Sequence, residues 1–189
     1  RRGALPIYDK VDLAAARQKG IQVTITPGAN GDSVADLAVA LMLDVARSVT
    51  IMDGSIKARS QKRPQGLEMF EKTLGIIGAG RIGQGVGRRC RGFNMKILAY
   101  DVFEDESFKK ETGAEYVDFE TLLRESDFIT VHSPLTEETH NMISTEQFKI
   151  MKKDAILVNT ARGGVIDEEA LYAALESGEI RGAALDATV

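Results

Sequence analysis

The chain has 189 residues, of which 43% are hydrophobic and 28% charged, and its formal net charge is -4. These values are sufficient for a globular domain with a sizeable core and exclude a disordered chain. Lys and Arg are scattered among Asp and Glu, so the charge pattern predicts no nucleic-acid partner. The apolar stretches are far shorter than the roughly 20 residues of a membrane span, and the chain opens without a signal segment. We therefore expect a cytoplasmic protein with no membrane partner.

The sequence offers little basis for metal or disulfide chemistry. Its one cysteine, Cys90, cannot form an internal disulfide and is predicted to be a small buried apolar residue. His132 and His140 are separated and lack the spacing of a metal site, so no metal is predicted. The chain opens on Arg1 and stops at Val189 without a terminating loop, and we expect it to be a piece of a longer protein.

The N-terminal part differs in pattern from the rest of the chain. Residues 11–19 predict a short helix closed by Gly20, and residues 21–26 predict a strand, as at the edge of another domain. Ser33 and Asp36 resemble a capping box at the start of one long amphipathic helix that runs to about Ala58. Residues 59–66 read as a linker.

From residue 73 onward, short runs rich in Ile, Val and Leu alternate with segments of helical periodicity. The predicted strands are residues 73–78, 95–101, 127–132, 155–160 and 182–186. The predicted helices are residues 81–93, 119–126, 145–151 and 168–177, the last with Gly178 as its C-cap. This alternation predicts an α/β fold with a doubly wound parallel sheet.

A glycine motif comes directly after the first of these strands and precedes the first helix. Gly78, Gly80 and Gly83 form G-x-G-x-x-G, which suits a tight turn, close approach of a pyrophosphate, and close helix–strand packing. The next strand ends in Asp101, 18 residues after Gly83 and near the usual spacing of roughly 20. Such an acid can bind both ribose hydroxyls of NAD and would repel the 2'-phosphate of NADP. The alternatives are a purely structural turn and a solvated acid in a loop.

A second motif comes after the strand of residues 155–160. Arg162 stands at the carboxyl end of this strand, where open α/β sheets bind ligands. Its guanidinium could grip a substrate carboxylate with two parallel hydrogen bonds, and Gly163 and Gly164 would leave room for backbone approach. The alternative is a surface arginine paired with Asp167 or Glu168. Position alone does not decide between these two interpretations.

Several ordered segments together resemble one protein family. They are "LGIIGAGRIGQGV", "ILAYD", "DFITVHSPLTEETHNMI", "ILVNTARGGVIDEEAL" and "GEIRGAALDA". The chain is similar to the D-isomer-specific 2-hydroxyacid dehydrogenases, which include D-3-phosphoglycerate dehydrogenases and glyoxylate/hydroxypyruvate reductases. The resemblance implies a Rossmann NAD-binding domain over residues 28–189, a remnant of a second, substrate-binding domain over residues 1–27, and a homodimer formed through a helix at about residues 31–58. A helix buried within its own domain is the alternative for that segment.

The resemblance also implies individual roles. Arg162 would be the catalytic arginine that orients a 2-hydroxyacid or 2-keto acid. The residues that would hold NAD are Gly78, Gly80, Arg81, Ile82, Gly83, Asp101, His132, Ser133, Pro134, Thr160, Ala161, Arg162 and Asp186. His132 matches a family position beside the cofactor. The alternative is a histidine that is merely held at the end of a strand. His140 is predicted to be a surface residue.

Two departures from the family pattern limit these expectations. The general acid/base histidine and its glutamate partner would fall beyond Val189, so this chain is expected to bind cofactor with negligible turnover. Leu5, Pro6 and Ile7 stand where the family has a G-x-G turn that meets substrate. A dinucleotide-regulated corepressor of the same fold, which carries a similar "NTARGG" segment, is the alternative function.

Overall fold

The computed structural model describes residues 11–61 and 63–189, and the chain divides into two compact units, Arg1–Asn30 and Gly31–Val189. In the first unit, α1 (Leu13–Gln18) begins after Asp12, whose carboxylate accepts a hydrogen bond of 2.9 Å from the Ala15 N–H. The predicted strand over residues 21–26 is wrong, because these residues form no strand. Ile21 and Ile25 remain exposed there and pair with no strand of the described chain. The predicted departure at Leu5, Pro6 and Ile7 lies outside the described residues.

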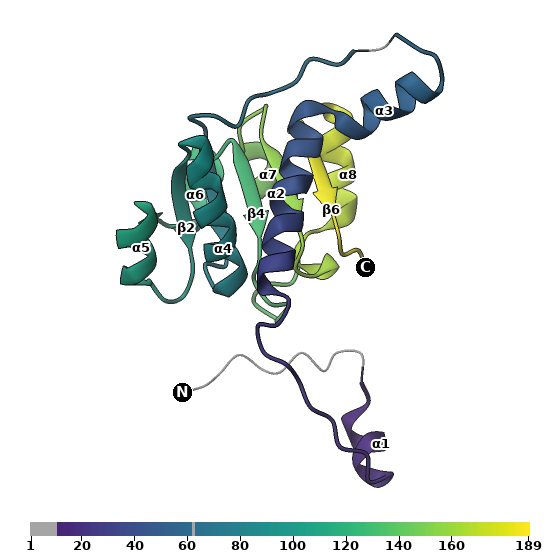
Figure 1. The fold of residues 1–189 in the computed structure, drawn as a ribbon, viewed down its shortest axis with the longest axis vertical. Coiled ribbons are helices and arrows are strands. Elements are labelled where there is room, and N and C mark those ends of the chain that lie inside the picture. The colour runs from purple at the N-terminus through teal and green to yellow at the C-terminus, as the bar shows by residue number, and fades with distance from the viewer. Residues whose placement is uncertain (1–10, 62) are drawn as a thin grey trace. The chain divides into compact units, whose positions relative to one another are not determined.

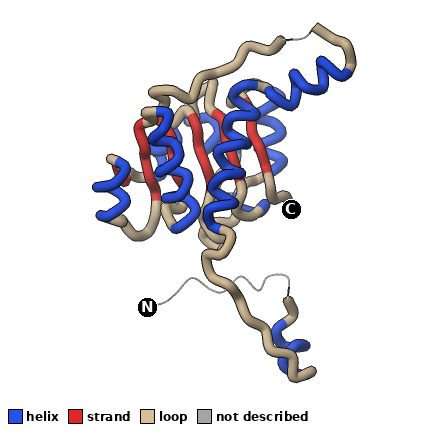
Figure 2. The backbone as a smooth tube through the Cα atoms, in the orientation of Figure 1, coloured by secondary structure: helices blue, strands red, loops and turns tan. Residues whose placement is uncertain are grey.

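The second unit contains a six-stranded sheet. Its strands are β1 (Thr73–Ile77), β2 (Lys96–Tyr100), β3 (Glu115–Tyr116), β4 (Phe128–Val131), β5 (Ile156–Asn159) and β6 (Gly182–Leu185). All neighbours pair in parallel, in the order β3-β2-β1-β4-β5-β6. This confirms the doubly wound parallel sheet, and Figure 2 shows its strands between helices. The two-residue strand β3 was not predicted.

The helices that connect these strands largely match the prediction. They are α4 (Arg81–Cys90), extended by the 3-10 turn η1 (Arg91–Phe93), α6 (Phe119–Glu125), α7 (Thr145–Ile150) and α8 (Glu168–Ser177). Gly178 ends α8 with φ of 71°, a left-handed conformation that favours glycine. Helix α5 (Glu106–Thr112), capped by the Asp105 carboxylate, was not predicted, and neither was the 3-10 turn η2 (Gly163–Val165).

The sheet is covered on both faces by separate apolar clusters. Helices α2 (Gly31–Arg47) and α4 pack on one face, and α6, α7 and α8 on the other (Figure 1). Consecutive residues of one strand enter different clusters, as Ile76 and Ile77 do. A Cβ at Gly87 of α4 would lie 2.7 Å from the Phe108 ring, so glycine there lets α4 pack closely against α5.

The predicted long helix over residues 33–58 is two helices, α2 and α3 (Val49–Lys57). Ser48 separates them with φ of 53°, and the Asp44 carboxylate accepts a hydrogen bond of 2.8 Å from the Thr50 N–H, which stabilises the start of α3. The predicted capping box is also wrong, because α2 already begins at Gly31. Asp36 instead accepts a hydrogen bond from Arg89 of α4 at 2.5 Å.

The segment between α3 and β1 contains no helix or strand in its described residues, as the linker prediction requires. One hydrogen bond attaches this segment to α2: the Leu67 N–H donates to the Ala46 carbonyl at 2.7 Å. Within residues 11–61 and 63–189, no helix combines the length and apolar character needed to cross a membrane.

Candidate functional site

The sequence-predicted site residues lie at the carboxyl edge of the sheet. The strand register aligns the last residues of five strands: Tyr100, Ile77, Val131, Asn159 and Leu185. The residues directly after them form the next row: Asp101, Gly78, His132, Thr160 and Asp186. Backbone hydrogen bonds extend into this row, with Gly78 donating to Tyr100 and His132 to Ile77. The order of the strands reverses between β1 and β4, which is where doubly wound sheets bind ligands.

The three motif glycines occupy three different environments. Gly78 has φ of +91°, and a Cβ there would lie 2.7 Å from the Ser133 nitrogen. A Cβ at Gly83 would strike the Gly78 carbonyl oxygen and lie 2.8 Å from Ile76 of β1. At Gly80, the N-cap of α4, a Cβ would meet no atom within 4 Å. The space above Gly80 and the first-turn N–H groups of α4 therefore fit a pyrophosphate.

Arg81 and Ile82 form the first turn of α4, directly after this open position. The backbone N–H groups of a first helical turn point toward the N-terminal end of the helix and carry partial positive charge. These N–H groups therefore lie where they could donate to a pyrophosphate placed over Gly80.

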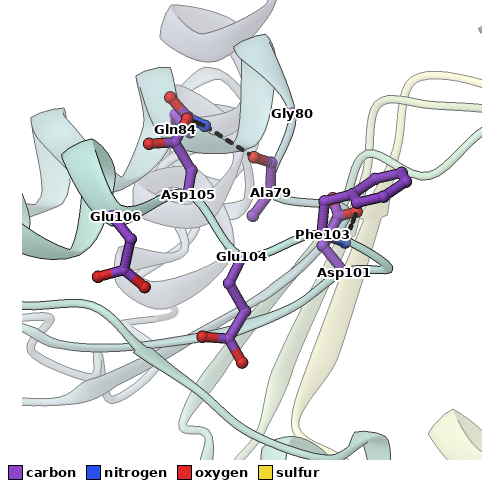
Figure 3. A pocket seen from close by; sticks show the side chains of 8 residues that line it. All are labelled: Ala79, Gly80, Gln84, Asp101, Phe103, Glu104, Asp105 and Glu106. Atoms are coloured by element: carbon purple, nitrogen blue, oxygen red, sulfur yellow. Dashed lines mark hydrogen bonds between the residues drawn. The ribbon is translucent and has the colours of Figure 1, made fainter. Parts of the chain in front are cut away.

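Asp101 lines a pocket of about 460 Å³ beside the glycine turn. Figure 3 shows its lining residues, which are Ala79, Gly80, Gln84, Asp101, Phe103, Glu104, Asp105 and Glu106. One oxygen of Asp101 accepts a hydrogen bond of 3.3 Å from the Phe103 N–H. The pocket therefore places a carboxylate and the open turn at Gly80 side by side, with three further acids in its wall.

His132 is held between two threonine hydroxyls. Its Nε2 lies 2.8 Å from the Thr130 hydroxyl, and its Nδ1 lies 3.4 Å from the Thr160 hydroxyl. Burial lowers the pKa of His132 to about 4. The imidazole is therefore neutral at pH 7 and is a poor proton donor. His140, by contrast, is exposed as predicted.

A buried asparagine shapes the loop that carries Arg162. Asn159, fully buried at the end of β5, accepts a hydrogen bond of 2.9 Å from the Ala161 N–H and donates one of 2.8 Å to the Arg162 carbonyl. The Arg162 guanidinium donates to the Ala161 carbonyl at 2.7 Å. Arg162 thus stands, half-buried, in a hydrogen-bonded loop at the carboxyl edge of the sheet.

The remaining predicted residues lie on the same edge. Ser133 is buried and packs against Gly78, whereas Pro134 is exposed in the loop after β4. Asp186, after β6, is exposed. The expectation that Gly163 leaves room for a ligand is wrong, because a Cβ there would lie 2.5 Å from the Val189 nitrogen of the chain itself.

Three residues at this edge were not predicted: Gln84, Asp105 and Asn159. Asn159 had a signal in the sequence, since it is the polar residue that closes an otherwise apolar run. Gln84 and Asp105 are far apart in the chain, and no spacing relates them. In the described part of the chain, no group of three His, Cys, Asp or Glu residues is arranged to hold a metal ion.

The strand order, the glycine turn and the acid at the end of β2 together define a dinucleotide-binding domain. Residues 39–189 match the NAD binding domain of the D-isomer specific 2-hydroxyacid dehydrogenases. The chain belongs to this family, and the cofactor of the domain is NAD.

Similar proteins include enzymes that act on several acids. The chain is 48% identical to a glyoxylate reductase of Thermococcus litoralis, covering 95% of this chain and 57% of that protein. It is 48% identical to a D-3-phosphoglycerate dehydrogenase of Methanocaldococcus jannaschii, covering 94% of this chain and 34% of that protein. The structure of a D-lactate dehydrogenase of Aquifex aeolicus with NAD and lactic acid superposes with a TM-score of 0.83 at 38% identity, covering 95% of this chain and 55% of that one. The chain thus spans about half the length of relatives such as the glyoxylate reductase, and less of the phosphoglycerate dehydrogenase.

Proposed function

We propose that the protein containing this chain is an NAD-dependent oxidoreductase that interconverts a D-2-hydroxyacid and its 2-keto acid. The observation that carries the proposal is the row at the carboxyl edge, which brings Asp101, the turn at Gly80 and the Arg162 loop to one edge of the sheet. The relatives support the proposal, because nearly the whole chain is similar in sequence to a glyoxylate reductase and a D-3-phosphoglycerate dehydrogenase.

The proposed cofactor contacts run along the strand ends. The N–H groups of Arg81 and Ile82 bind the pyrophosphate over Gly80, and Asp101 accepts hydrogen bonds from the adenosine ribose. His132, Ser133 and Pro134 are assigned to border the cofactor, and Thr160, Ala161 and Asp186 to surround its nicotinamide ribose and carboxamide. When bound, NAD supplies the carbon that donates or accepts hydride.

Arg162 is the proposed catalytic residue. Its guanidinium binds the substrate carboxylate through two hydrogen bonds and polarises the neighbouring carbonyl, a task for which its planar donors suit it better than those of lysine. His132 does not serve as the proton donor, because its pKa of about 4 leaves it neutral at pH 7. The proposal assigns proton transfer to a histidine that the family resemblance places beyond Val189.

Calorimetric titration of the chain with NADH and NADPH tests the cofactor site. We expect NADH to bind more tightly, because Asp101 and its acidic neighbours repel a 2'-phosphate. Asp101→Ala should weaken NADH binding by about tenfold or more, the value of a hydrogen bond to a charged group. Asp53→Ala on α3 is the matched control and should leave the affinity unchanged. Equal binding of NADH by the wild type and Asp101→Ala would contradict the ribose role.

Turnover is tested by mixing 2-keto acid and NADH with the chain and, in parallel, with the full-length protein. We expect NADH oxidation by the full-length protein and negligible oxidation by the chain. In the full-length protein, Arg162→Lys should lower kcat/KM by at least about tenfold, because lysine cannot form the bidentate contact. Steady oxidation by the chain alone would contradict the requirement for the histidine outside it.

We also propose that the full-length protein is a cytoplasmic homodimer and that residues 1–27 belong to its substrate-binding domain. Helix α3 supports the dimer, because none of its side chains is buried while Val49, Ile51 and Ile56 are exposed. Light scattering should report a dimer, and Ile51→Glu should shift it toward the monomer, whereas Val102→Glu in the loop after β2 should not. A monomeric wild type would refute the assembly.

The relatives named above are enzymes, and none supports the corepressor alternative.

A further inference from the structure

One side-chain amide joins the two parts of the pocket in Figure 3. The Gln84 Nε2 of α4 donates to the Ala79 carbonyl at 3.0 Å and to the Asp105 carboxylate at 3.1 Å. Its Oε1 accepts a hydrogen bond of 3.3 Å from Arg88. Because Arg88 can only donate and the other two groups can only accept, these contacts define which end of the amide carries the nitrogen.

The two acceptors of Gln84 belong to the two proposed contact regions of the cofactor. Ala79 lies within the glycine turn, between Gly78 and Gly80. Asp105 closes the loop that begins at Asp101. Gln84 therefore connects the proposed pyrophosphate site to the loop of the proposed ribose acid.

Asp105 is itself firmly anchored. Its carboxylate caps α5 through the Phe108 N–H at 2.9 Å, and its own N–H donates to the Tyr116 hydroxyl at 3.1 Å. The hydrogen bond from Phe108 and then that from Gln84 lower the pKa of Asp105, so the contact with Gln84 is to a carboxylate at neutral pH. A bond to a charged group is stronger than one between neutral groups.

The loop between Asp101 and Asp105 has little burial to hold it. Val102 and Phe103 are 83% and 81% exposed. Within it, the Phe103 N–H donates to Asp101 and the Glu104 carboxylate contacts Lys109 of α5, whereas the Asp105–Gln84 hydrogen bond joins it to the glycine turn. In a bound nucleotide the ribose and the pyrophosphate are covalently joined at a fixed distance. The pyrophosphate can therefore bind the glycine turn while the ribose binds Asp101 only if the turn and the loop of Asp101 stay at a matching distance from each other.

We propose that Gln84 is a positioning residue for the adenosine half of the cofactor, holding the loop of Asp101 at a fixed distance from the glycine turn. The inference rests on the proposed roles of Gly80 and Asp101. Without the Gln84 bridge, binding has to order the loop as well as form the contacts, and affinity falls by that cost. The loss should concentrate on the contact with the ribose.

The test compares ADP with 2'-deoxy-ADP, which lacks one of the ribose hydroxyls. The wild-type chain should prefer ADP, and Gln84→Ala should weaken ADP about tenfold while weakening 2'-deoxy-ADP about twofold, so that the preference shrinks. Gln84→Glu keeps the shape but turns an oxygen toward two acceptors, and should weaken ADP at least as much.

Gln147→Ala is the matched control, because Gln147 accepts a bond of 3.1 Å from the Ser144 N–H in the capping box of α7, away from the pocket. It should leave both affinities unchanged. Unchanged ADP binding in both Gln84 variants would overturn the inference, and so would equal losses for the two nucleotides, which would indicate general damage to the site. Failure of the wild type to bind NADH and ADP would instead overturn the proposed cofactor site and the inference with it.

Discussion

Replacing Gly80 by alanine separates what the glycine does for the fold from what it does for a ligand. Gly80 has φ of -75° and ψ of -162°, which any residue adopts, and a Cβ there meets no atom within 4 Å. The folded chain should therefore accept Gly80→Ala at a cost below about 1 kcal/mol, the difference between glycine and alanine at an N-cap. A bound pyrophosphate would meet the new methyl group.

The magnitude of the binding loss depends on the contacts that the methyl group displaces. Each hydrogen bond from a first-turn N–H of α4 to a charged phosphate contributes about 1.5–3 kcal/mol. Losing one such bond weakens NADH binding by about 10- to 100-fold. Titration calorimetry gives the dissociation constant, and a thermal melt of the same sample gives the stability.

Gly92→Ala is the matched control, because a Cβ at Gly92 also meets no atom within 4 Å but lies in η1, beyond the opposite end of α4. It should leave NADH binding unchanged. If Gly80→Ala binds NADH as tightly as the wild type does, the pyrophosphate does not lie over Gly80. If the variant instead loses several kcal/mol of stability, the open space assigned to that position is wrong.

Three further predictions concern the site and its support. Gly83→Ala should lower the free energy of unfolding by about 1–3 kcal/mol, measured in urea, because the methyl group strikes the Gly78 carbonyl. Asn159→Ala should lower it by about 2–4 kcal/mol in the same assay, because two backbone partners in the Arg162 loop lose their hydrogen bonds. The unfolded state binds a proton at His132 near pH 6.5, but the folded state does so only near pH 4. The free energy of unfolding of the wild type should therefore fall as the pH is lowered between these two values, by up to about 1.4 kcal/mol per pH unit. His132→Gln should lack this part of the pH dependence when the two proteins are compared in urea.

Different results would contradict each of these predictions. Wild-type stability of Gly83→Ala would mean that helix α4 can move away from β1 at no cost. Wild-type stability of Asn159→Ala would mean that other groups or water replace its hydrogen bonds. A His132 titration near pH 6.5 by NMR would show that burial does not hold the imidazole neutral.

The sheet was predictable because its strands are buried on both faces and read as continuous apolar runs. The predicted strand over residues 73–78 is one residue longer than β1, and that over residues 155–160 is one residue longer than β5 at each end. Strand β3 has only two residues and leaves no such run, and α5 lies in a strongly charged segment where the apolar periodicity is weak. These two elements were missed for that reason.

The break between α2 and α3 shows a contact that overrides periodicity. The apolar spacing continues past Ser48, so a single helix was the natural prediction. The carboxylate of Asp44 instead binds both the N–H and the hydroxyl of Thr50. Side-chain capping of this kind depends on local geometry and leaves only a weak signal in residue order.

Residues at the strand ends were predictable from position, and the residues that hold them were not. Asp101 and Arg162 stand at the ends of apolar runs, so an open α/β sheet places them at the ligand-binding edge. Gln84 and Asp105 meet only because α4 and the loop after β2 lie side by side in the fold. Spacing along the chain carries no trace of such a contact.

The row of strand ends also sets how the site responds to heat. Its members Gly78, Asp101, His132, Thr160 and Asp186 are each the immediate continuation of a different strand, so the spacing of their backbones is set by the hydrogen-bond ladder of the sheet, and Gln84 adds to it only where the loop after Asp101 leaves the sheet. Fraying of a terminal helix leaves that ladder intact, since local opening is confined to weakly packed parts of a protein. The binding edge should therefore hold its shape until the sheet itself melts, and lose it in one cooperative step.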